Sequence, residues 1–387
     1  MTKLFSSPYG DLSLQRIPSG DKSLQAWDAA DEFLLAHLEE EAKLDNKQGI
    51  AIVNDAFGAI SCALFKYQRD NIGDSFLSHL AAKKNLSRNN VESDVENYRE
   101  IRSTDTLENN YDVLLIKVPK SLALLEDQLI QLRAVLSTSS HIIAAGMTKN
   151  IHKSTLDLFS RIIGPTRTSL AKKKARLIYS QYSPSCFSEA ERFDYFSGKR
   201  LLSYRLEGCQ FKLLNYPAVF SRSKLDIGTR FFLPHIANLV ENQRQIIDLG
   251  CGNGALGFMA AISNPDANVT FIDESYQAIE SVRKGIDTLP EQYRDNHVAK
   301  VNNILSDVAP KEYDLVLCNP PFHQENSMGK QTAYEMFIQA KKVLKEGGSL
   351  NIVANRHLQY HHKLKRLYGN CCVIDSNKKF VILQAVK

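Results

Sequence analysis

The sequence repeats a pattern from its second half within its first half, and this repetition strongly limits the possible folds. Residues 313–323 (YDLVLCNPPFH) align with residues 111–121 (YDVLLIKVPKS). Residues 246–257 (IIDLGCGNGALG) align with residues 50–61 (IAIVNDAFGAIS), in the same order and at nearly the same spacing. A long internal repeat indicates that one structural unit is used twice.

The alternation of short apolar runs with longer polar stretches predicts an α/β fold with parallel strands in both halves. The runs are rich in branched residues, and helices are expected between them. The expected strands cover residues 49–53, 111–118, 141–145, 245–249, 269–273, 313–318 and 349–354. Two further runs, 371–376 and 380–386, are separated by Asn377, Lys378 and Lys379 and predict a C-terminal β-hairpin.

The length of 387 residues also favours two domains. Residues 180–199 (SQYSPSCFSEAERFDYFSGK) show neither the helical nor the strand period and contain Ser, Pro and Gly, as is typical of a linker. We therefore predict domains at 1–190 and 191–387.

Composition excludes several classes of protein. The seven cysteines are scattered, with no Cys-x-x-Cys pair, which argues against a disulfide framework or a zinc site and fits a reducing cytoplasm. No apolar run reaches the roughly 18 residues of a membrane span, and the N-terminus does not resemble a signal peptide. The net charge of +5 suits a polyanionic partner without requiring one.

A glycine-rich turn follows the expected strand at 245–249. Residues 248–254 read DLGCGNG, and Gly250, Gly252 and Gly254 allow a tight turn that a ligand can approach closely. The dinucleotide spacing G-x-G-x-x-G would require glycine at position 255, which is alanine. Asp248, ahead of the first glycine, favours a cationic or amine-bearing ligand over a pyrophosphate.

The next two strands add candidate contacts for such a ligand. Asp273 ends the strand at 269–273, and a carboxylate there can accept hydrogen bonds from both hydroxyls of a ribose. The third strand ends near Asn303, whose amide offers the donor and the acceptor that an adenine edge needs. Its neighbour Asn302 is the alternative.

The fourth strand ends in Asn319, Pro320, Pro321 and Phe322. Consecutive prolines stop the ladder and make a rigid turn at the carboxyl edge of the sheet, where open α/β folds bind ligands. The Asn319 side chain and the Pro320 carbonyl offer two acceptors, and Phe322 offers a flat ring. Together they suit a planar amino group.

The first half retains the apolar strands but has different residues at the chemical positions. Ile52, Asn54 and Ala56 stand where the second half has Asp248, Gly250 and Gly252, although Gly58 aligns with Gly254. Residues 117–120 (KVPK) replace the Asn-Pro-Pro-Phe motif. The first half is therefore expected to be a degenerate copy.

These residues resemble the class I S-adenosylmethionine (SAM)-dependent methyltransferases that act on exocyclic amino groups. The two-copy layout is similar to the bacterial ribosomal RNA guanine-N2 methyltransferases, and most similar to the large-subunit RlmG family. Residues 54–59 (NDAFGA), 219–228 (VFSRSKLDIG), 319–324 (NPPFHQ) and 353–358 (VANRHL) support this resemblance.

The resemblance implies two tandem Rossmann-like domains, each with a seven-stranded sheet and a C-terminal β-hairpin, that methylate guanine N2 in 23S rRNA. It assigns the cofactor to Asp248, Gly250, Gly252, Gly254, Asp273, Asn303 and Asn319. It assigns the target base to Asn319, Pro320, Pro321 and Phe322. No metal, DNA or membrane partner is implied, and the nucleotide and the oligomeric state stay open.

Four alternatives remain: 16S rRNA as the substrate, the glutamine amide of release factors, an amino group of DNA, and a catalytically silent RNA-binding factor. The release-factor enzymes resemble a Tyr version of the motif with a helical N-terminal domain, unlike Phe322 and the α/β first half. The degenerate half is expected to position RNA, and residues 172–176 (KKKAR) are candidates for phosphate contacts.

Overall fold

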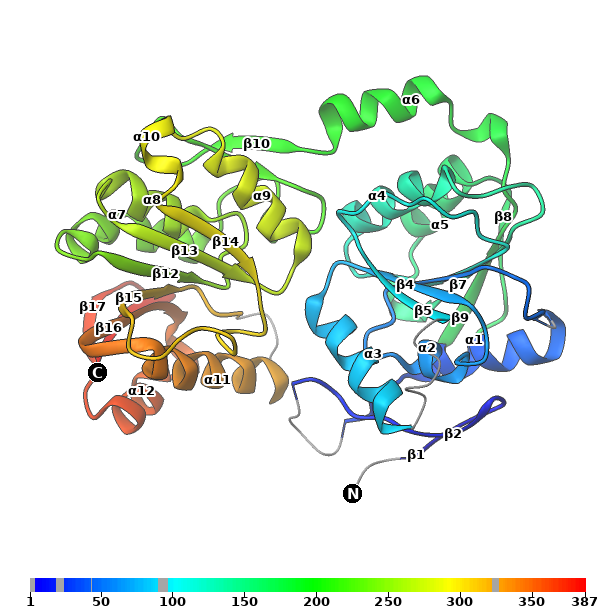
Figure 1. Ribbon diagram of the computed structural model, residues 1–387, viewed down its shortest axis with the longest axis horizontal. Coiled ribbons are helices and arrows are strands. Elements are labelled where there is room, and N and C mark those ends of the chain that lie inside the picture. The colour runs from blue at the N-terminus through cyan, green and yellow to red at the C-terminus, as the bar shows by residue number, and fades with distance from the viewer. Residues whose placement is uncertain (1–3, 19–23, 43, 90–96, 322–326) are drawn as a thin grey trace. The chain divides into compact units, whose positions relative to one another are not determined.

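The protein folds into two compact units, Met1–Arg200 and Leu201–Lys387, each of which is described by itself. The structure is a computed structural model that describes residues 4–18, 24–42, 44–89, 97–321 and 327–387. Figure 1 labels the elements of both units. Within the described residues, no helix is long and apolar enough to cross a membrane.

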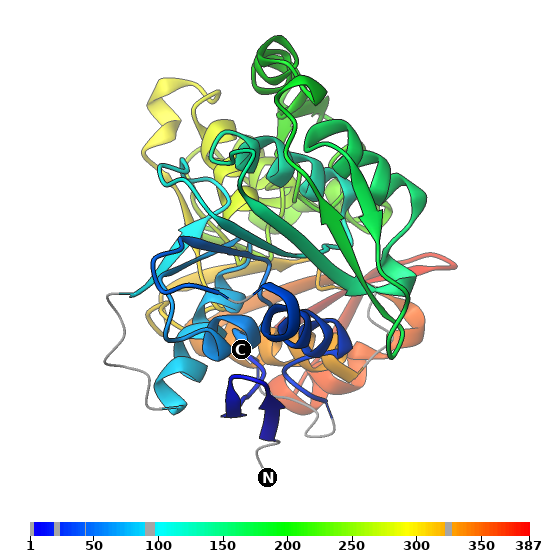
Figure 2. The same ribbon diagram turned by 90° about the vertical axis from the view of Figure 1, so that its right-hand side faces the viewer.

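The first unit is built around a seven-stranded sheet with strand order β5-β4-β3-β6-β7-β9-β8. The strands are parallel except β9, which is antiparallel to β7 and β8. Figure 2 shows β8 and β9 in green at the edge of this sheet. In sheet order, the bounds are β5 (Tyr98–Arg102), β4 (Arg69–Gly73), β3 (Ile50–Val53), β6 (Val113–Lys117), β7 (His141–Met147), β9 (Ala175–Ser180) and β8 (Thr166–Thr168).

Helices cover both faces of this sheet, because successive residues of its strands point to opposite sides. Ile50 and Ile52 of β3 pack against α1 (Ala29–His37), α2 (Ala59–Ala63) and α3 (Phe76–Arg88). Ala51 and Val53 pack with α4 (Leu122–Arg133) and α5 (Lys153–Ile162) on the other face. A small hairpin, β1 (Leu4–Ser7) and β2 (Gly10–Ser13), precedes these elements.

The second unit has the same architecture, with strand order β14-β13-β12-β15-β16-β18-β17. The strands are parallel except β18, which is antiparallel to β16 and β17, and the C-terminal hairpin predicted from the sequence is β17–β18. In sheet order, the bounds are β14 (His297–Val301), β13 (Asn268–Asp273), β12 (Gln245–Leu249), β15 (Tyr313–Cys318), β16 (Leu344–Asn355), β18 (Phe380–Val386) and β17 (Cys372–Ser376).

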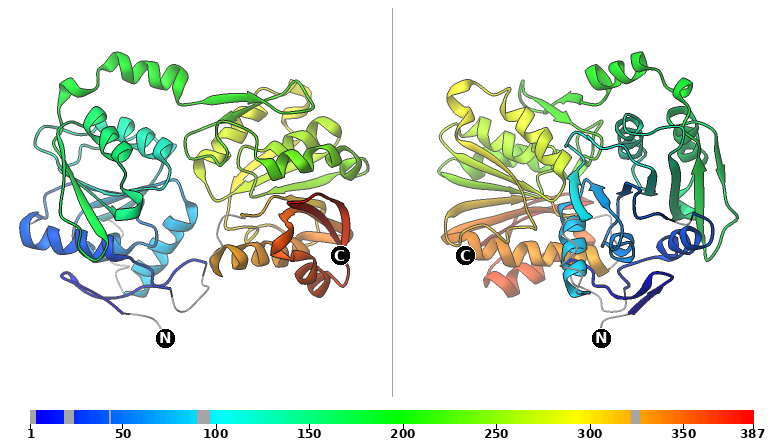
Figure 3. Two further views of the ribbon diagram at one scale, coloured as in Figure 1. Left: turned by 180° about the vertical axis from the view of Figure 1, so that it is seen from behind. Right: turned by 45° about the vertical axis from the view of Figure 1, so that its right-hand side comes forward.

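Its helices also lie on both faces of the sheet, as Figures 1 and 3 show. One face carries α7 (Ile227–Val240), α8 (Ala255–Ser263) and α9 (Tyr276–Ile286), and the other carries α11 (Ser327–Val343) and α12 (Tyr360–Tyr368). The short α10 (Glu291–Arg294) precedes β14. A hairpin of β10 (Leu202–Arg205) and β11 (Lys212–Asn215) again comes first, so the repeated unit includes this hairpin.

Local details of the two units match as well. Gly58 and Gly254 are the residues ahead of α2 and α8, and both adopt left-handed φ values, 78° and 80°. An added Cβ would lie 2.4 Å from Ala82 Cα at Gly58 and 2.8 Å from the Phe258 ring at Gly254. Glycine is therefore required by conformation and by packing at both positions, whether or not a ligand is nearby.

The segment expected to be a linker is largely helical and packs on the first unit. Ser188 and Glu191 form a capping box that starts α6 (Glu189–Asp194). Tyr195 donates its hydroxyl to the buried Asp127 carboxylate at 3.1 Å, and Arg200 pairs with the same carboxylate at 2.9 Å. The residue-190 boundary inferred from sequence thus falls inside α6, whereas the units divide after Arg200.

Candidate functional site

The glycine-rich turn joins β12 to α8 and leaves open space at its middle glycine. Gly252 has a φ of 54°, and a Cβ added to it would have no atom within 4 Å. The Gly250 and Cys251 amides donate to the Ile272 carbonyl, which ties the turn to β13. A ligand can therefore approach the backbone at Gly252, while the rest of the turn is held by its neighbours.

Asp248 is buried at the end of β12, where its carboxylate accepts a hydrogen bond from the Gly257 amide of α8 at 2.8 Å. Burial raises the pKa of Asp248 to about 8, and the nearby negative charge of Asp273 adds to the rise, while the Gly257 amide opposes it. A positively charged ligand beside this carboxylate would favour its ionised form.

Asp273 ends β13 and is half-buried. One carboxylate oxygen accepts from the Gly252 amide at 2.8 Å and the other from the Ser275 amide at 3.0 Å. Burial raises the pKa of Asp273, and these backbone hydrogen bonds lower it. The carboxylate is thus fixed directly beside the open glycine.

Asn302 and Asn303 follow β14 and differ in their bonding. The side-chain oxygen of the buried Asn302 accepts a hydrogen bond from the Ser306 hydroxyl at 2.9 Å, and the backbone N–H of Asn302 donates to the Asp273 carbonyl at 3.0 Å. Asn303 is half-buried, and no described residue hydrogen-bonds to its side chain. Asn303 is therefore the better placed of the two to reach a ligand.

Asn319 directly follows β15, and only the nitrogen of its side-chain amide is hydrogen-bonded to described residues. The Nδ2 atom donates to Asp226 Oδ2 at 3.0 Å and to Thr229 Oγ1 at 2.8 Å. The Oδ1 atom is buried and accepts no hydrogen bond from the described residues. An unpaired buried acceptor costs about 1–3 kcal/mol, so this oxygen is a strong candidate for a ligand contact.

Of the other residues in the Asn-Pro-Pro-Phe motif, the structure describes Pro320 and Pro321. Pro320 is buried and Pro321 is exposed. Phe322 lies outside the described residues.

The sheet brings the predicted residues to one edge. The strands β14, β13, β12 and β15 are adjacent and parallel, so their carboxyl ends share that edge. At these carboxyl ends lie Asn303, Asp273, the glycine-rich turn and Asn319. This is the edge at which open α/β sheets bind ligands.

The equivalent edge of the first unit is filled by the protein's own side chains. Strand register places Gly73 where the second unit has Asp273, and Lys117 where it has Asn319. Asn54 stands at the position of Gly250 with a similar φ of 62°, and its side chain donates to the Lys117 carbonyl at 3.0 Å. Lys117 Nζ in turn binds the carboxylates of Asp28, the N-cap of α1, and of Asp31 within α1, at 2.8 and 2.6 Å.

Two residues of the second-unit site were not predicted from the sequence: Asp226 and Thr229. Asp226 is the N-cap of α7, where its side chain accepts from the Thr229 amide. An Asp ahead of an apolar helix is a recognisable N-cap signal, but it predicts only the start of a helix.

The turn is also held by a polar network from the preceding hairpin, which the sequence did not reveal. Asn253 donates to the Tyr204 hydroxyl at 2.7 Å and to Asn215 Oδ1 at 2.9 Å. The hairpin β10–β11 thereby braces the glycine turn from outside the sheet.

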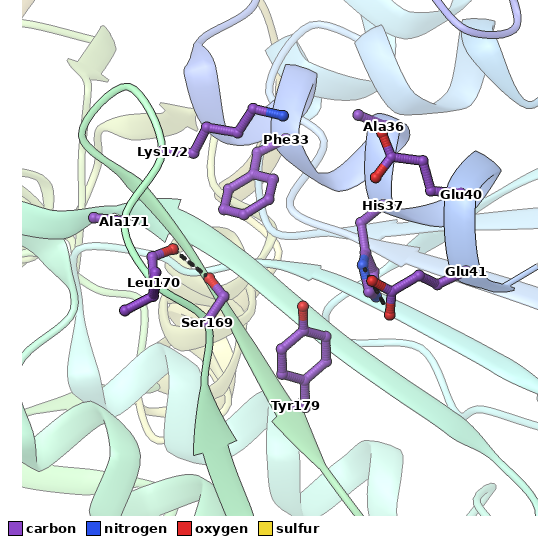
Figure 4. A pocket seen from close by; sticks show the side chains of 10 residues that line it. All are labelled: Phe33, Ala36, His37, Glu40, Glu41, Ser169, Leu170, Ala171, Lys172 and Tyr179. Carbon is purple, nitrogen blue, oxygen red and sulfur yellow. Dashed lines mark hydrogen bonds and ion pairs between the residues drawn. The ribbon is translucent and has the colours of Figure 1, made fainter.

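A separate hollow of about 370 Å³ lies in the first unit beside the basic loop between β8 and β9 (Figure 4). The rings of Phe33 and Tyr179 and the carboxylates of Glu40 and Glu41 line it. Lys172 Nζ lies 5.6 Å from the Phe33 ring centre. Lys173 pairs with Glu32 at 2.8 Å, and Lys174 is exposed. The basic run is therefore partly neutralised by acidic neighbours.

Comparisons with known proteins cover nearly the whole chain. Residues 2–184 match the RLMG N-terminal domain, and residues 210–384 match the methyltransferase small domain. The structure of the T. Thermophilus 16S rRNA N2 G1207 methyltransferase (RsmC), in complex with AdoMet and guanosine, is similar with a TM-score of 0.74 at 17% identity, covering 100% of this chain and 98% of that one.

A shorter likeness is to the structure of P. horikoshii TYW2 in complex with MeSAdo. It covers 48% of this chain and 70% of that one, with 13% identity and a TM-score of 0.37. The full-length likeness and the two domain matches confirm the predicted fold of tandem Rossmann-like units with antiparallel C-terminal hairpins.

Proposed function

Because the chain belongs to the RlmG family of SAM-dependent rRNA guanine-N2 methyltransferases, we propose that the second unit methylates N2 of one guanine in 23S rRNA. The product is N2-methylguanosine, and the reaction is expected in the cytoplasm. The observation that carries the proposal is the buried, unpaired Oδ1 of Asn319, an acceptor placed where an exocyclic amino group can donate to it.

The sheet edge suits SAM in its shape and in the charged and hydrogen-bonding groups that it offers. Gly252 leaves room for a ligand against the backbone, and Asp248 supplies a buried carboxylate that a cationic group would complement. Asp273 and Asn303 would hold the ribose and the adenine, and Gly250 and Gly254 shape the turn. When bound, SAM supplies an electrophilic methyl group on a sulfonium sulfur.

The Asn-Pro-Pro-Phe motif would activate the guanine 2-amino group, which is a poor nucleophile. The lone pair of the guanine 2-amino group is conjugated with the ring, so the nitrogen attacks weakly. Hydrogen bonds to Asn319 Oδ1 and to the Pro320 carbonyl would draw the two N–H bonds out of the plane of the ring. The nitrogen lone pair would then be less conjugated with the ring and would point towards the methyl group. Catalysis is then mainly alignment, and the methylated nitrogen loses its proton afterwards.

Phe322 and Pro321 would complete the base site. An aromatic ring that stacks on an extruded guanine offsets part of the few kcal/mol needed to unstack it. The first unit would position the RNA, because its own sheet edge is closed by Lys117 and Asn54. Lys174, exposed on the β8–β9 loop, is the lysine of the basic run best placed to meet a phosphate.

The test is to incubate the protein with methyl-labelled SAM and, separately, protein-free 23S rRNA, 16S rRNA and a release factor, and to identify the labelled product. N2-methylguanosine in 23S rRNA alone is the expected result. The same nucleoside in 16S rRNA would reverse the choice of subunit, and labelled glutamine would overturn the RNA assignment. SAM binding without any labelled product would indicate a silent RNA-binding factor.

A further inference from the structure

We propose that Asp226 and Thr229 are positioning residues that hold the Asn319 amide in the one orientation that presents an acceptor to the target amino group. The inference rests on the proposed function and adds to it the reason why the site takes an amino group. Both residues come from the start of α7, outside the Asn-Pro-Pro-Phe motif.

An asparagine amide has two ends of nearly equal size but opposite hydrogen-bonding character, so its orientation decides its chemistry. The Nδ2 end of Asn319 donates to Asp226 Oδ2 at 3.0 Å and to Thr229 Oγ1 at 2.8 Å. If the amide turned over, its oxygen would face the Asp226 carboxylate, and two acceptors would oppose each other. The flipped amide would also offer N–H groups to the substrate.

Asp226 and Thr229 contribute differently to this choice. A hydroxyl can donate or accept, so Thr229 alone would tolerate either orientation of the amide. An ionised carboxylate can only accept, and Asp226 therefore excludes the flipped form. Thr229 is buried and supplies the second acceptor, so that both N–H bonds of Asn319 are used and its oxygen is left over.

The first unit contains the same arrangement with a different outcome. Asp28 is the N-cap of α1, as Asp226 is of α7, and Asp31 lies three residues into that helix, as Thr229 does. Both carboxylates bind Lys117 Nζ, at 2.8 and 2.6 Å. A lysine has no acceptor to offer once it is held, whereas an asparagine held by its nitrogen retains one. In both units, the N-cap carboxylate thus accepts a hydrogen bond from the side-chain nitrogen of the residue at the carboxyl end of the fourth strand, β6 or β15.

The experiment compares truncated and conservative variants in the full-length protein. Thr229→Val removes the hydroxyl but leaves the backbone amide that caps against Asp226, and Thr229→Ser restores an acceptor. Asp226→Ala removes the acceptor for both the Thr229 backbone amide and Asn319 Nδ2. Asp226→Asn retains one side-chain oxygen that can accept both hydrogen bonds. For each variant, kcat, KM for RNA, the Kd for SAM and the melting temperature are measured.

We expect Thr229→Val to lower kcat about threefold to tenfold and Asp226→Ala about tenfold to a hundredfold, as loss of a neutral and of a charged hydrogen-bond acceptor implies. KM and the SAM Kd should stay within about twofold of wild type, since the truncations leave the glycine turn intact. Thr229→Ser should recover most of the loss caused by Thr229→Val. Asp226→Asn should recover only part of the loss caused by Asp226→Ala, because its side-chain amide can also donate to a flipped Asn319.

A second readout does not depend on activity. In ¹⁵N-labelled protein, the side-chain amide protons of Asn319 should exchange slowly with solvent in wild type and in Thr229→Ser. They should exchange at least about tenfold faster in Asp226→Ala, because a lost charged hydrogen bond of that strength opens the amide.

Unchanged kcat in both truncations would overturn the proposal. So would a loss of SAM affinity equal to the loss of turnover, or conservative variants no better than the truncations. If wild type methylates no RNA yet the exchange rates follow the expected order, the proposed function fails and the positioning role stands. If methylation is as expected but the exchange rates do not differ, the positioning role alone fails.

Discussion

Raising the pH from 6 to 7 should tighten SAM binding about tenfold, because Asp248 must ionise to meet a cationic ligand and its pKa is about 8. With that pKa, about one carboxyl in a hundred is ionised at pH 6 and about one in eleven at pH 7. Bound SAM lowers the pKa of the neighbouring carboxyl, so the affinity rises with pH until the free protein is itself ionised, and levels off above pH 8.

Isothermal titration calorimetry tests this directly. SAM is titrated at pH 6.0, 6.5 and 7.0 in two buffers with different ionisation enthalpies, and the difference in heat counts the protons released. Wild type should release close to one proton per SAM at pH 7. Asp248→Asn has no proton to lose, so its affinity should be lower at pH 7 and should change little over the same range.

Two results would refute the reasoning. The first is a wild-type affinity that does not change between pH 6 and 7, with no proton release. The second is an Asp248→Asn variant with the same pH slope as wild type, which would assign the titration to another group. In either case, Asp248 would be a structural residue that holds α8 through the Gly257 amide.

Other predictions concern single positions. Asn319→Ala should retain SAM binding and lose most turnover, measured by single-turnover methyl transfer. Gly252→Ala should weaken SAM binding because its Cβ enters the open space, whereas Gly257→Ala should lower the melting temperature because its Cβ would lie 2.3 Å from the Phe271 ring. Phe322→Ala should raise KM for RNA more than the SAM Kd. Lys174→Glu should weaken RNA binding and reduce its log–log salt slope by about one or more.

Four results would contradict the expectations for Asn319, Gly252, Phe322 and Lys174. Wild-type turnover in Asn319→Ala would remove the motif from the chemistry. Equal SAM affinity in wild type and Gly252→Ala would show that the cofactor does not approach that turn. If Phe322→Ala weakened SAM and RNA alike, a structural role would follow. An unchanged salt slope in Lys174→Glu, with SAM binding as a control, would place RNA elsewhere.

The central strands of the second-unit sheet could be predicted because burial on both faces requires short, continuous apolar runs. The observed bounds of β12 and β15 equal the predicted ones. The edge strands β5 and β8 of the first unit were not predicted, because exposed charged and polar residues leave them without a continuous apolar run. The helical nature of residues 184–199 was missed although Ser188 and Glu191 give the capping signal, because the segment is too short to show a helical period.

Some residues of the candidate site could also be predicted from the sequence, and others could not. The glycine turn, Asp273 and Asn319 could be proposed because each follows a strand whose end fixes its place. Asp226 could not, because it meets Asn319 across 93 residues of sequence through a side-chain hydrogen bond. The bracing of Asn253 by Tyr204 is equally non-local, at a separation of 49 residues. Strand periodicity carries no information about such contacts.

The ion pairs of Lys117 with Asp28 and Asp31 also limit how the chemistry of the second unit could be restored in the first. A reversion Lys117→Asn would leave two carboxylates, Asp28 and the buried Asp31, facing a neutral amide, and burial already raises the pKa of Asp31 to about 6 despite the lysine. The reversion is therefore destabilising unless Asp31 changes in the same step. Even then, Ile52 and Gly73 would still lack the carboxylates of the other copy. Restoring the chemistry of the second unit would therefore need several substitutions together, because the single change Lys117→Asn lowers stability before any activity can return.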